Sequence, residues 1–253
     1  MEDEKLDVVI LAAGYSTRLY PLTKNFPKPL LEVGEKPVIT NIVEKLENLK
    51  EIGNVYVITN DKFYKHFLNW EKNLKTTLDI VVISDGTSSE KDKLGAMGDV
   101  NFVIKEKSIN RPLFIIGGDN LFDFGLRDMV NYFKEKNKDV VCASEIKELS
   151  RLKNMGVAKL DKNNKIIFLE EKPENPPSRL AVSCMYLYTK ETTSLIKKYL
   201  EDGNNPDNTG SFLQWLYPRK EVYAFINKGK IIDIGTPETL EKARKEFIFS
   251  SCS

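Results

Sequence analysis

The chain has 253 residues, with 38 lysines and arginines against 37 aspartates and glutamates and a formal net charge of +1. This balance gives no general attraction for nucleic acid or an anionic membrane, although it does not exclude a local basic pocket. One histidine and three widely spaced cysteines argue against histidine-dependent triads, multi-histidine metal sites and a disulfide framework.

The length predicts one large domain or two closely merged halves over residues 1–253, and the absence of a linker favours a single domain. No segment approaches the ~18 consecutive apolar residues of a membrane span. The amino terminus, MEDEKLDVVILAAG, is acidic where a secretory signal would be basic. We therefore expect a cytoplasmic protein with neither a membrane nor a nucleic acid as partner.

Short β-branched segments alternate with helical spacing through the first half of the chain. The expected strands are Leu6–Ala13, Asn54–Thr59, Leu78–Ser84 and Pro112–Gly118. The expected helices are Pro37–Leu49, Lys62–Leu74 and Gly95–Lys105. This alternation predicts an α/β fold with a mostly parallel sheet and helices on both faces. Such sheets bind ligands at the carboxyl ends of their strands, so the loops after the strands are the candidates for a site.

The second half predicts a mixed, partly antiparallel continuation of the sheet. In chain order, the expected elements are a helix at Leu126–Lys136, a strand at Asp139–Glu145, a hairpin turned at Asp161–Asn164, a strand at Arg179–Tyr188, helices at Lys190–Tyr199 and around Phe212–Tyr217, strands near Val222–Ile226 and Lys230–Asp233, and a helix at Pro237–Glu246. No linker or repeat separates the two halves.

The first loop lies in the most informative segment, LAAGYSTRLYPLTKNFPKPLL, residues 11–31. A buried strand ends at Ala13, and the backbone amides from Gly14 to Thr17 are placed to line a phosphate. Gly14 allows close approach, and the hydroxyls of Ser16 and Thr17 add donors.

Two cations follow in the same segment, Arg18 and Lys28. Pro27 and Pro29 restrict the backbone on either side of Lys28. Two fixed cations beside an amide-lined loop suit a polyphosphate whose charge shifts during a reaction. A surface loop with incidental charges is the alternative interpretation.

This segment resembles the signature of the sugar-1-phosphate nucleotidyltransferases, also called nucleoside-diphosphate-sugar pyrophosphorylases. The matching residues are Gly14, Ser16-Thr17-Arg18-Leu19, Pro21-Leu22-Thr23 and Pro27-Lys28-Pro29-Leu30-Leu31, with Ser16 where glycine is commoner. Within the family, the chain is most similar to the glucose-1-phosphate thymidylyltransferase-like branch. The resemblance covers about residues 6–245. It implies a Rossmann-like nucleotidyltransferase fold, with a nucleotide-binding half over about 1–145 and a sugar-phosphate-binding half over about 146–253.

The resemblance also implies two groups of site residues. Asp119 and Asp233, which the sequence places at strand ends, would hold Mg2+ together, although each alone is also a common turn or capping residue. The motif FLEEKPENP resembles the family's Glu-Lys-Pro motif. The residues expected on the sugar-phosphate side are Asn120, Gly156, Glu171, Lys172 and Val182.

The expected nucleobase loop departs from the family's pattern. Asp85-Gly86-Thr87 stands where Gln-Pro is usual, and Gly95 lies near the position of a Gly-Leu-Ala motif. The residues expected to bind the nucleotide are Ala13, Gly14, Ser16 and Thr17 of the first loop together with Asp85, Gly86 and Gly95. The resemblance leaves the choice among dTTP, UTP and CTP open, with backbone groups at Gly86 as candidates for pairing with a pyrimidine.

The implied reaction is nucleotidyl transfer from an NTP to a sugar 1-phosphate, with glucose 1-phosphate as the expected acceptor. Arg18 and Lys28 would be catalytic, and Mg2+ would be the cofactor. Two alternatives stay open: a cytidylyltransferase acting on phosphocholine or another phosphorylated alcohol, and a non-catalytic nucleotide-sugar sensor. The sequence does not fix the sugar, or the oligomeric state, and a homo-oligomer is possible.

Overall fold

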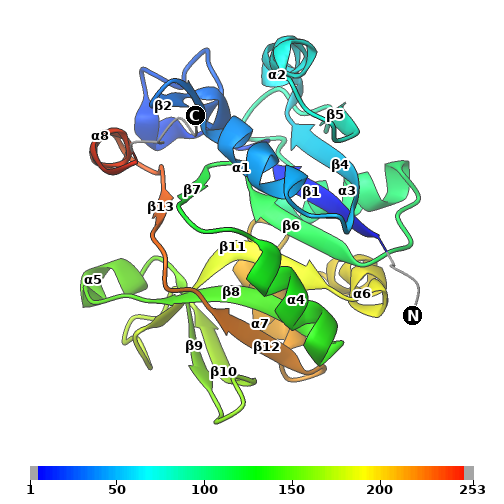
Figure 1. Cartoon of the computed structure of the whole chain (residues 1–253), viewed down its shortest axis with the longest axis vertical. Coiled ribbons are helices and arrows are strands. Elements are labelled where there is room, and N and C mark those ends of the chain that lie inside the picture. Colours follow the sequence, from blue (N-terminus) through cyan, green and yellow to red (C-terminus); the bar gives the residue numbers. More distant parts are fainter. Residues whose placement is uncertain (1–4, 248–253) are drawn as a thin grey trace.

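Segments from both halves of the chain form one nine-stranded sheet in a computed structural model, which describes residues 5–247 (Figure 1). The remaining residues of the expected domain, 1–4 and 248–253, lie outside the described part. The strands of this sheet are β1 Leu6–Leu11, β4 Ile52–Thr59, β5 Ile80–Ser84, β6 Leu113–Gly117, β8 Asp139–Glu145, β9 Gly156–Leu160, β10 Ile166–Glu171, β11 Leu180–Tyr188 and β12 Val222–Ile226.

The topology confirms the expected mixed, mostly parallel sheet. Strands β5, β4, β1 and β6 are neighbours in that order and run parallel. Strand β11 runs antiparallel to β6, β8 and β9, and β12 runs parallel to β8. Strand β1 lies between β4 and β6, so the order of strands reverses there. A crevice at the carboxyl ends of β1 and β6 is the position at which such sheets bind ligands.

Helices cover both faces of the sheet, as predicted. They are α1 Val38–Glu47, α2 Asp61–Asn73, α3 Ala96–Glu106, α4 Arg127–Lys136, α5 Leu149–Leu152, α6 Lys190–Glu201, α7 Thr209–Leu216 and α8 Pro237–Glu246. Side chains alternate along β1, with Val8 and Ile10 in one core cluster and Val9 in the other. Helices α1, α2 and α4 pack in the first cluster, and α3, α6 and α7 pack in the second.

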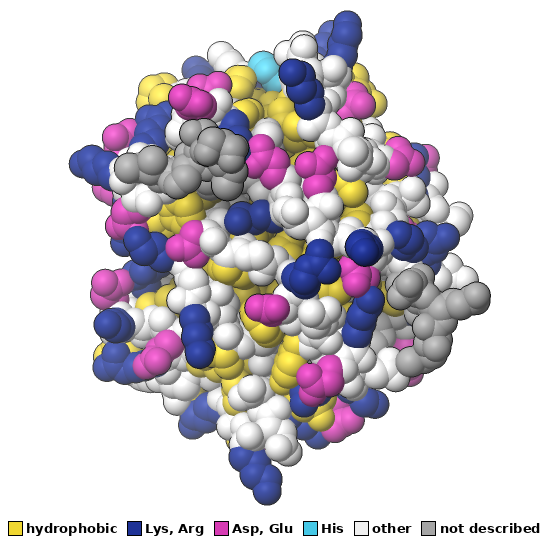
Figure 2. Space-filling model, in the orientation of Figure 1, with side chains coloured by type: hydrophobic (Ala, Val, Ile, Leu, Met, Phe, Trp, Pro, Cys, Tyr) yellow, Lys and Arg dark blue, Asp and Glu magenta, His cyan; other side chains and the backbone are white. Residues whose placement is uncertain are grey.

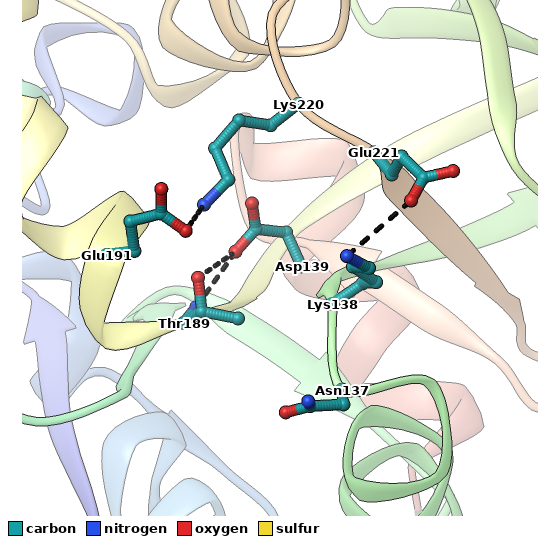
Figure 3. Close-up of a pocket in the computed structure, with 7 residues that line it drawn as sticks. All are labelled: Asn137, Lys138, Asp139, Thr189, Glu191, Lys220 and Glu221. Carbon is teal, nitrogen blue, oxygen red and sulfur yellow. Dashed lines mark hydrogen bonds and ion pairs between the residues drawn. The ribbon is translucent and has the colours of Figure 1, made fainter.

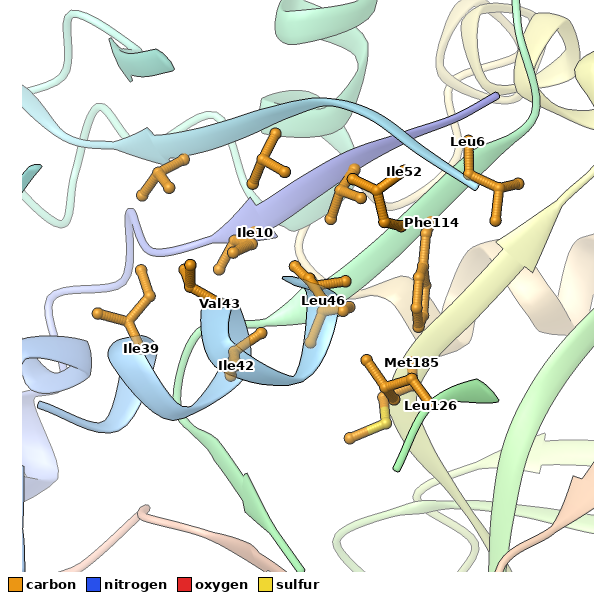
Figure 4. Packing of buried hydrophobic residues seen from close by; sticks show 14 of the residues in the cluster. Leu6, Ile10, Ile39, Ile42, Val43, Leu46, Ile52, Phe114, Leu126 and Met185 are labelled. Carbon is orange, nitrogen blue, oxygen red and sulfur yellow. The ribbon is translucent and has the colours of Figure 1, made fainter. Parts of the chain in front are cut away.

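The packing of α1 shows how the first core forms (Figure 4). Ile39, Ile42 and Leu46 recur at helical spacing and are fully buried. They face Ile10 of β1 and Phe114 of β6. Full burial of such a side chain contributes about 1.5–3 kcal/mol.

A third apolar cluster lies outside the two faces of the large sheet. It joins Leu19 and Leu31 from the first loop to Leu121, Ile232 and residues of α8. Its backbone includes a small sheet of β7 Asn120–Phe122 paired with β13 Ile231–Asp233. Two short 3-10 helices, η1 Thr17–Leu19 and η2 Lys28–Leu30, and the strand pair β2 Glu32–Val33 and β3 Lys36–Pro37 complete the first loop region.

Most elements begin and end within about two residues of the expected positions; β1, for example, ends at Leu11 and not at Ala13. Helix α7 and strand β7 differ more. Helix α7 begins at Thr209, not around Phe212, because the Asn208 side chain accepts a hydrogen bond from the backbone N–H of Ser211 and caps the helix earlier. Strand β7 is not predicted, because three residues are too few to show an alternating pattern.

On the surface, the face in Figure 2 carries lysine and arginine side chains interspersed with aspartate and glutamate. Within residues 5–247, no helix has the length and apolar character needed to cross a membrane.

Candidate active site

Lys28 is a buried cation between two carboxyl groups. It begins η2, directly after Pro27 and before Pro29. Its side chain is only 11% exposed; the ammonium forms an ion pair with Asp119 and lies 3.6 Å from Oδ1 of Asp233. Burial lowers the pKa of Lys28, but the two carboxylates outweigh burial and raise its pKa above the usual value. Lys28 therefore stays charged at neutral pH.

The small sheet explains how the two carboxyl groups meet. Asp119 directly precedes β7, and Asp233 ends β13 opposite Asn120. The backbone N–H of Ile234 also donates to the carbonyl of Asp119 at 3.4 Å. Burial raises the pKa of Asp119, but the Lys28 charge outweighs burial and holds this pKa below its usual value.

Arg18 completes this group of charges from the other short helix, η1. A β-carbon at Gly235 would lie 3.6 Å from Nη2 of Arg18 and 3.7 Å from Oδ2 of Asp233. The Arg18 guanidinium and the Asp233 carboxyl group therefore border the same space at Gly235. The structure brings together the two predicted cations and the two predicted metal ligands, which come from three separate segments of the chain.

The loop that follows β1 is braced by two side chains: Asn60, which the sequence did not single out, and Thr23, which belongs to the motif of residues 11–31. The Asn60 side chain donates to the carbonyl of Ala13 at 2.8 Å, and the Thr23 hydroxyl donates to the carbonyl of Ser16 at 2.7 Å. Ser16 has the left-handed conformation, with φ +51°. A β-carbon at Gly14 would meet no other atom within 4 Å, so open space adjoins this loop.

The loops on the expected nucleobase side are shaped by two glycines. Gly86 follows β5 with φ +79°, and Gly95 caps α3 with φ +81°. A β-carbon at Gly95 would lie 2.6 Å from the carbonyl oxygen of Pro206. The first N–H groups of α3 donate to the carbonyls of Pro206 and Asp207, so backbone already occupies this helix N-terminus. Direct contact of Gly95 with a nucleotide stays a prediction.

Strand register brings together three residues of the expected sugar-phosphate side. Gly156 of β9 lies opposite Glu171 of β10 on one side and Val182 of β11 on the other. A β-carbon at Gly156 would lie 2.9 Å from Oε2 of Glu171, so the glycine makes room for this carboxyl group. Lys172 follows with φ +53°, a conformation that non-glycine residues rarely adopt.

Asn120 and Cys184 connect these residues to Asp119. The Asn120 side chain donates to the carbonyl of Cys184 at 3.1 Å, and Cys184 Sγ lies 3.7 Å from the hydroxyl of Thr209 in α7. Burial raises the pKa of Cys184 to about 12, so this thiol is not a nucleophile at neutral pH.

Comparison with known proteins decides the family. Residues 7–248 match the family model described as nucleotidyl transferase. The chain belongs to this family. The residues gathered around Lys28 are therefore read as parts of a nucleotidyltransferase.

Curated relatives of this nucleotidyltransferase carry different names. It is 29% identical to the bifunctional protein GlmU of Methanocaldococcus jannaschii over 95% of the chain and 54% of the relative. It is 26% identical to the glucose-1-phosphate adenylyltransferase of Desulfitobacterium hafniense strain Y51, over 98% of the chain and 65% of the relative. The chain thus spans about half the length of the GlmU relatives.

Solved structures share the fold. A protein from Bacillus anthracis assigned as a glucose-1-phosphate thymidylyltransferase aligns with a TM-score of 0.78 and 25% identity, over 97% of each chain. A UDP-glucose pyrophosphorylase in complex with UDP-glucose aligns with a TM-score of 0.79 and 23% identity, over 95% of this chain and 97% of the other.

The nucleotidyltransferase has a donor set that fits a hard divalent cation. Residues 5–247 contain no cluster of three or more histidine, cysteine, aspartate or glutamate side chains with metal-binding geometry. Asp119 and Asp233 nevertheless suffice for Mg2+, which proteins bind through one or two carboxylates together with phosphate oxygens. Both carboxylates lie around the Lys28 ammonium.

A polar hollow elsewhere on the nucleotidyltransferase is a structural network (Figure 3). It lies where β8 and β12 begin. Asp119 follows the carboxyl end of β6, so the hollow and Asp119 lie at opposite ends of the strands. Asp139 accepts hydrogen bonds from the backbone N–H and hydroxyl of Thr189 at 2.8 and 3.1 Å. Lys220 pairs with Glu191 at 2.6 Å. These charged groups are already paired, so the hollow offers no reactive group.

Proposed function

We propose that the chain catalyses nucleotidyl transfer from an NTP to a sugar 1-phosphate and releases pyrophosphate. The observation that carries this proposal is the buried Lys28 ammonium between Asp119 and Asp233, with Arg18 beside them. Two polyanions must meet in this reaction, so positioning and neutralisation of charge account for most of the catalysis. A phosphate oxygen of the sugar phosphate attacks the α-phosphorus of the NTP. That oxygen is already an anion, so no general base is needed.

Each charged residue has a distinct role in the proposal. The amides from Gly14 to Thr17, together with Arg18, bind the triphosphate and stabilise the departing pyrophosphate. Lys28 meets the charge that develops at the reacting phosphorus. Asp119 and Asp233 hold Mg2+, which when bound neutralises phosphate oxygens.

The second half of the chain binds the acceptor in this proposal. Lys172 holds the phosphate of the sugar phosphate, and the Glu171 carboxylate accepts hydrogen bonds from sugar hydroxyls. Asn120, Gly156 and Val182 border the same space. The roles divide the domain into a nucleotide-binding half over about residues 1–145 and a sugar-phosphate-binding half over about 146–253.

We propose a pyrimidine nucleotide as donor and glucose 1-phosphate as acceptor. The glycine-bearing loop at Gly86 suits pairing of backbone groups with a small base edge. Glucose 1-phosphate is named in relatives that differ in their nucleotide. The free thiols of Cys142 and Cys184 suit a cytoplasmic, reducing location.

Neither alternative gains support from the described residues. A phosphocholine site needs an aromatic cage for the quaternary ammonium. Tyr186 and Tyr188 are buried and stack on each other, with ring centroids 5.7 Å apart, which makes them part of the core. A non-catalytic sensor has no need for a lysine clamped between two carboxylates.

Pyrophosphate release tests the proposal. The assay combines each of five NTPs with a panel of sugar 1-phosphates and with phosphocholine, in the presence of Mg2+. We expect release with at least one pyrimidine nucleotide and a hexose 1-phosphate. Silence with every pair would favour the sensor, and release only with phosphocholine would favour the phosphorylated-alcohol alternative.

A further inference from the structure

Two carboxyl groups are buried against each other behind the loop that follows β5. Asp85 directly follows that strand and Asp99 lies in the first turn of α3; they are 8% and 6% exposed. Their side chains share a hydrogen bond. Two ionised carboxylates have no donor between them, so this contact requires one proton. Oδ1 of Asp99 is buried and receives no hydrogen bond from an N–H or O–H donor among the described residues.

The surroundings decide where the proton resides. Asp85 accepts hydrogen bonds from the backbone N–H and the hydroxyl of Thr87 at 2.7 and 2.8 Å, which favours its charged form. Among residues 5–247, no lysine or arginine forms an ion pair with either carboxyl group. The proton therefore belongs to Asp99. Burial and the neighbouring Asp85 raise the pKa of Asp99 to about 8.

Hydrogen bonds through Thr87 and Tyr15 connect the Asp85–Asp99 pair to the loop after β1. The Thr87 hydroxyl gives its proton to Asp85, so it accepts the hydrogen bond from the Tyr15 phenol at 3.2 Å. Tyr15 directly follows Gly14. The titratable groups facing this chain of hydrogen bonds, besides the pair and Tyr15, are Asp92 and Glu90 on the loop between β5 and α3. Both carry negative charge when ionised, so neither can balance a second charge on the pair.

We propose that Asp99 is a positioning residue for nucleotide binding, because the proton that it shares with Asp85 fastens the Asp85–Thr87 loop to α3 and, through Tyr15, to the loop after β1. This inference rests on the proposed function only in placing a nucleotide against these two loops. Loss of the shared proton leaves two adjacent buried negative charges, which repel each other and displace the loop. Nucleotide affinity then falls at alkaline pH.

Thermal unfolding tests the shared proton without any substrate. Between the usual pKa of an aspartate and the raised pKa of the pair, the folded state holds a proton that the unfolded state lacks, so wild-type stability falls as pH rises. The amide introduced by Asp99→Asn cannot titrate. We expect the Tm difference between Asp99→Asn and wild type to increase from pH 5 to pH 8 and to level off above. A difference that does not change with pH would overturn the shared proton.

Asp92→Asn is the matched control for this series. It makes the same carboxyl-to-amide change in the loop that leads to α3, but hydrogen bonds from Ser88 and Ser89 lower the pKa of Asp92 to about 2, so this group does not titrate between pH 5 and pH 8. We expect its Tm to differ from wild type by a constant amount between pH 5 and pH 8. A rise with pH equal to that of Asp99→Asn would show a general charge effect and would overturn the assignment to the pair.

Calorimetric titration with Mg–CTP and Mg–dTTP, without sugar phosphate, tests the positioning role. From pH 7 to pH 9, we expect wild type to lose about tenfold more affinity than Asp99→Asn, since one pH unit above the pKa leaves about a tenth of the molecules with the shared proton. Equal losses would overturn the positioning role. Asp99→Leu, which keeps the branched shape of the side chain but removes the hydrogen bond, should bind weakly at both pH values. If wild type binds neither nucleotide at pH 7, the proposed function and the nucleotide role fail, whereas the melting series still decides whether the proton is shared.

Discussion

The contact between Gly210 and Glu171 leaves no room for a methyl group. A β-carbon at residue 210, in the first turn of α7, would lie 2.6 Å from Cδ of Glu171 and closer still to Oε2. Gly156 limits the same carboxyl group from the other side, at 2.9 Å. We therefore expect Gly210→Ala to displace the Glu171 carboxylate from the proposed sugar site.

The size of the effect follows from what Glu171 is proposed to do. A hydrogen bond to a charged group contributes about 1.5–3 kcal/mol, so its loss should lower kcat/KM for glucose 1-phosphate by about tenfold to 150-fold. The fold should survive, because alanine is favoured over glycine in a helix by about 0.5–1 kcal/mol. The assay is pyrophosphate release at saturating NTP, with a second series that measures KM for the NTP.

Gly125→Ala provides the control. A β-carbon at Gly125 would meet nothing within 4 Å, and its backbone conformation is open to other residues. We expect Gly125→Ala to behave as wild type. Gly210→Ala combined with Glu171→Ala should cost no more than Glu171→Ala alone. An unchanged kcat/KM in Gly210→Ala, or an equal rise in KM for the NTP, would refute the reasoning.

Three further outcomes are expected. Lys28→Ala should lower kcat by about 10²–10³ with little change in NTP affinity, because it removes charge stabilisation that develops in the transition state; a raised KM with intact kcat would make Lys28 a binding residue only. Asp119→Asn and Asp233→Asn should each abolish the response of activity to added Mg2+ while the far-UV circular dichroism stays that of wild type, and full turnover in excess chelator would contradict the metal assignment. In competitive measurements, kcat/KM should be higher for pyrimidine than for purine nucleotides and should differ little among dTTP, UTP and CTP. The reason is that Asp85 replaces the glutamine that is usual at this position and that could reject the wrong base. A clear preference for ATP or GTP would contradict the expected pyrimidine preference.

Sequence reasoning locates the large elements because their signals are local. Helix α8 begins and ends at the predicted residues, since Pro237 suits the first turn and Thr236 caps it. The strand Asp139–Glu145 is likewise confirmed at both ends. The early start of α7 depends on the capping contact of Asn208, a residue type that also occurs widely in loops.

For the candidate site, the sequence identifies residue types but not most of their contacts. The pairing of β7 with β13, which places Asp119 near Asp233, is too short to leave a pattern. The hydrogen bond from Asn60 that braces the first loop crosses between distant segments and has no sequence signal, and the motif that contains Thr23 does not reveal its bond to Ser16. The same is true of the contact between Asp85 and Asp99, where only folding brings a strand end against a helix.

The third apolar cluster packs beside the proposed reaction centre and is separate from the two large cores, so the two parts of the molecule can differ in local stability. Leu19 adjoins Arg18, Leu121 lies two residues after Asp119, and Ile232 and Ile234 flank Asp233, and all four are buried in this cluster. Because the cluster is separate from the two large cores, it can open while the nine-stranded sheet stays folded. Such an opening would move Arg18 and Lys28 away from Asp119 and Asp233 in a single step. Activity would then disappear on heating before most of the secondary structure does.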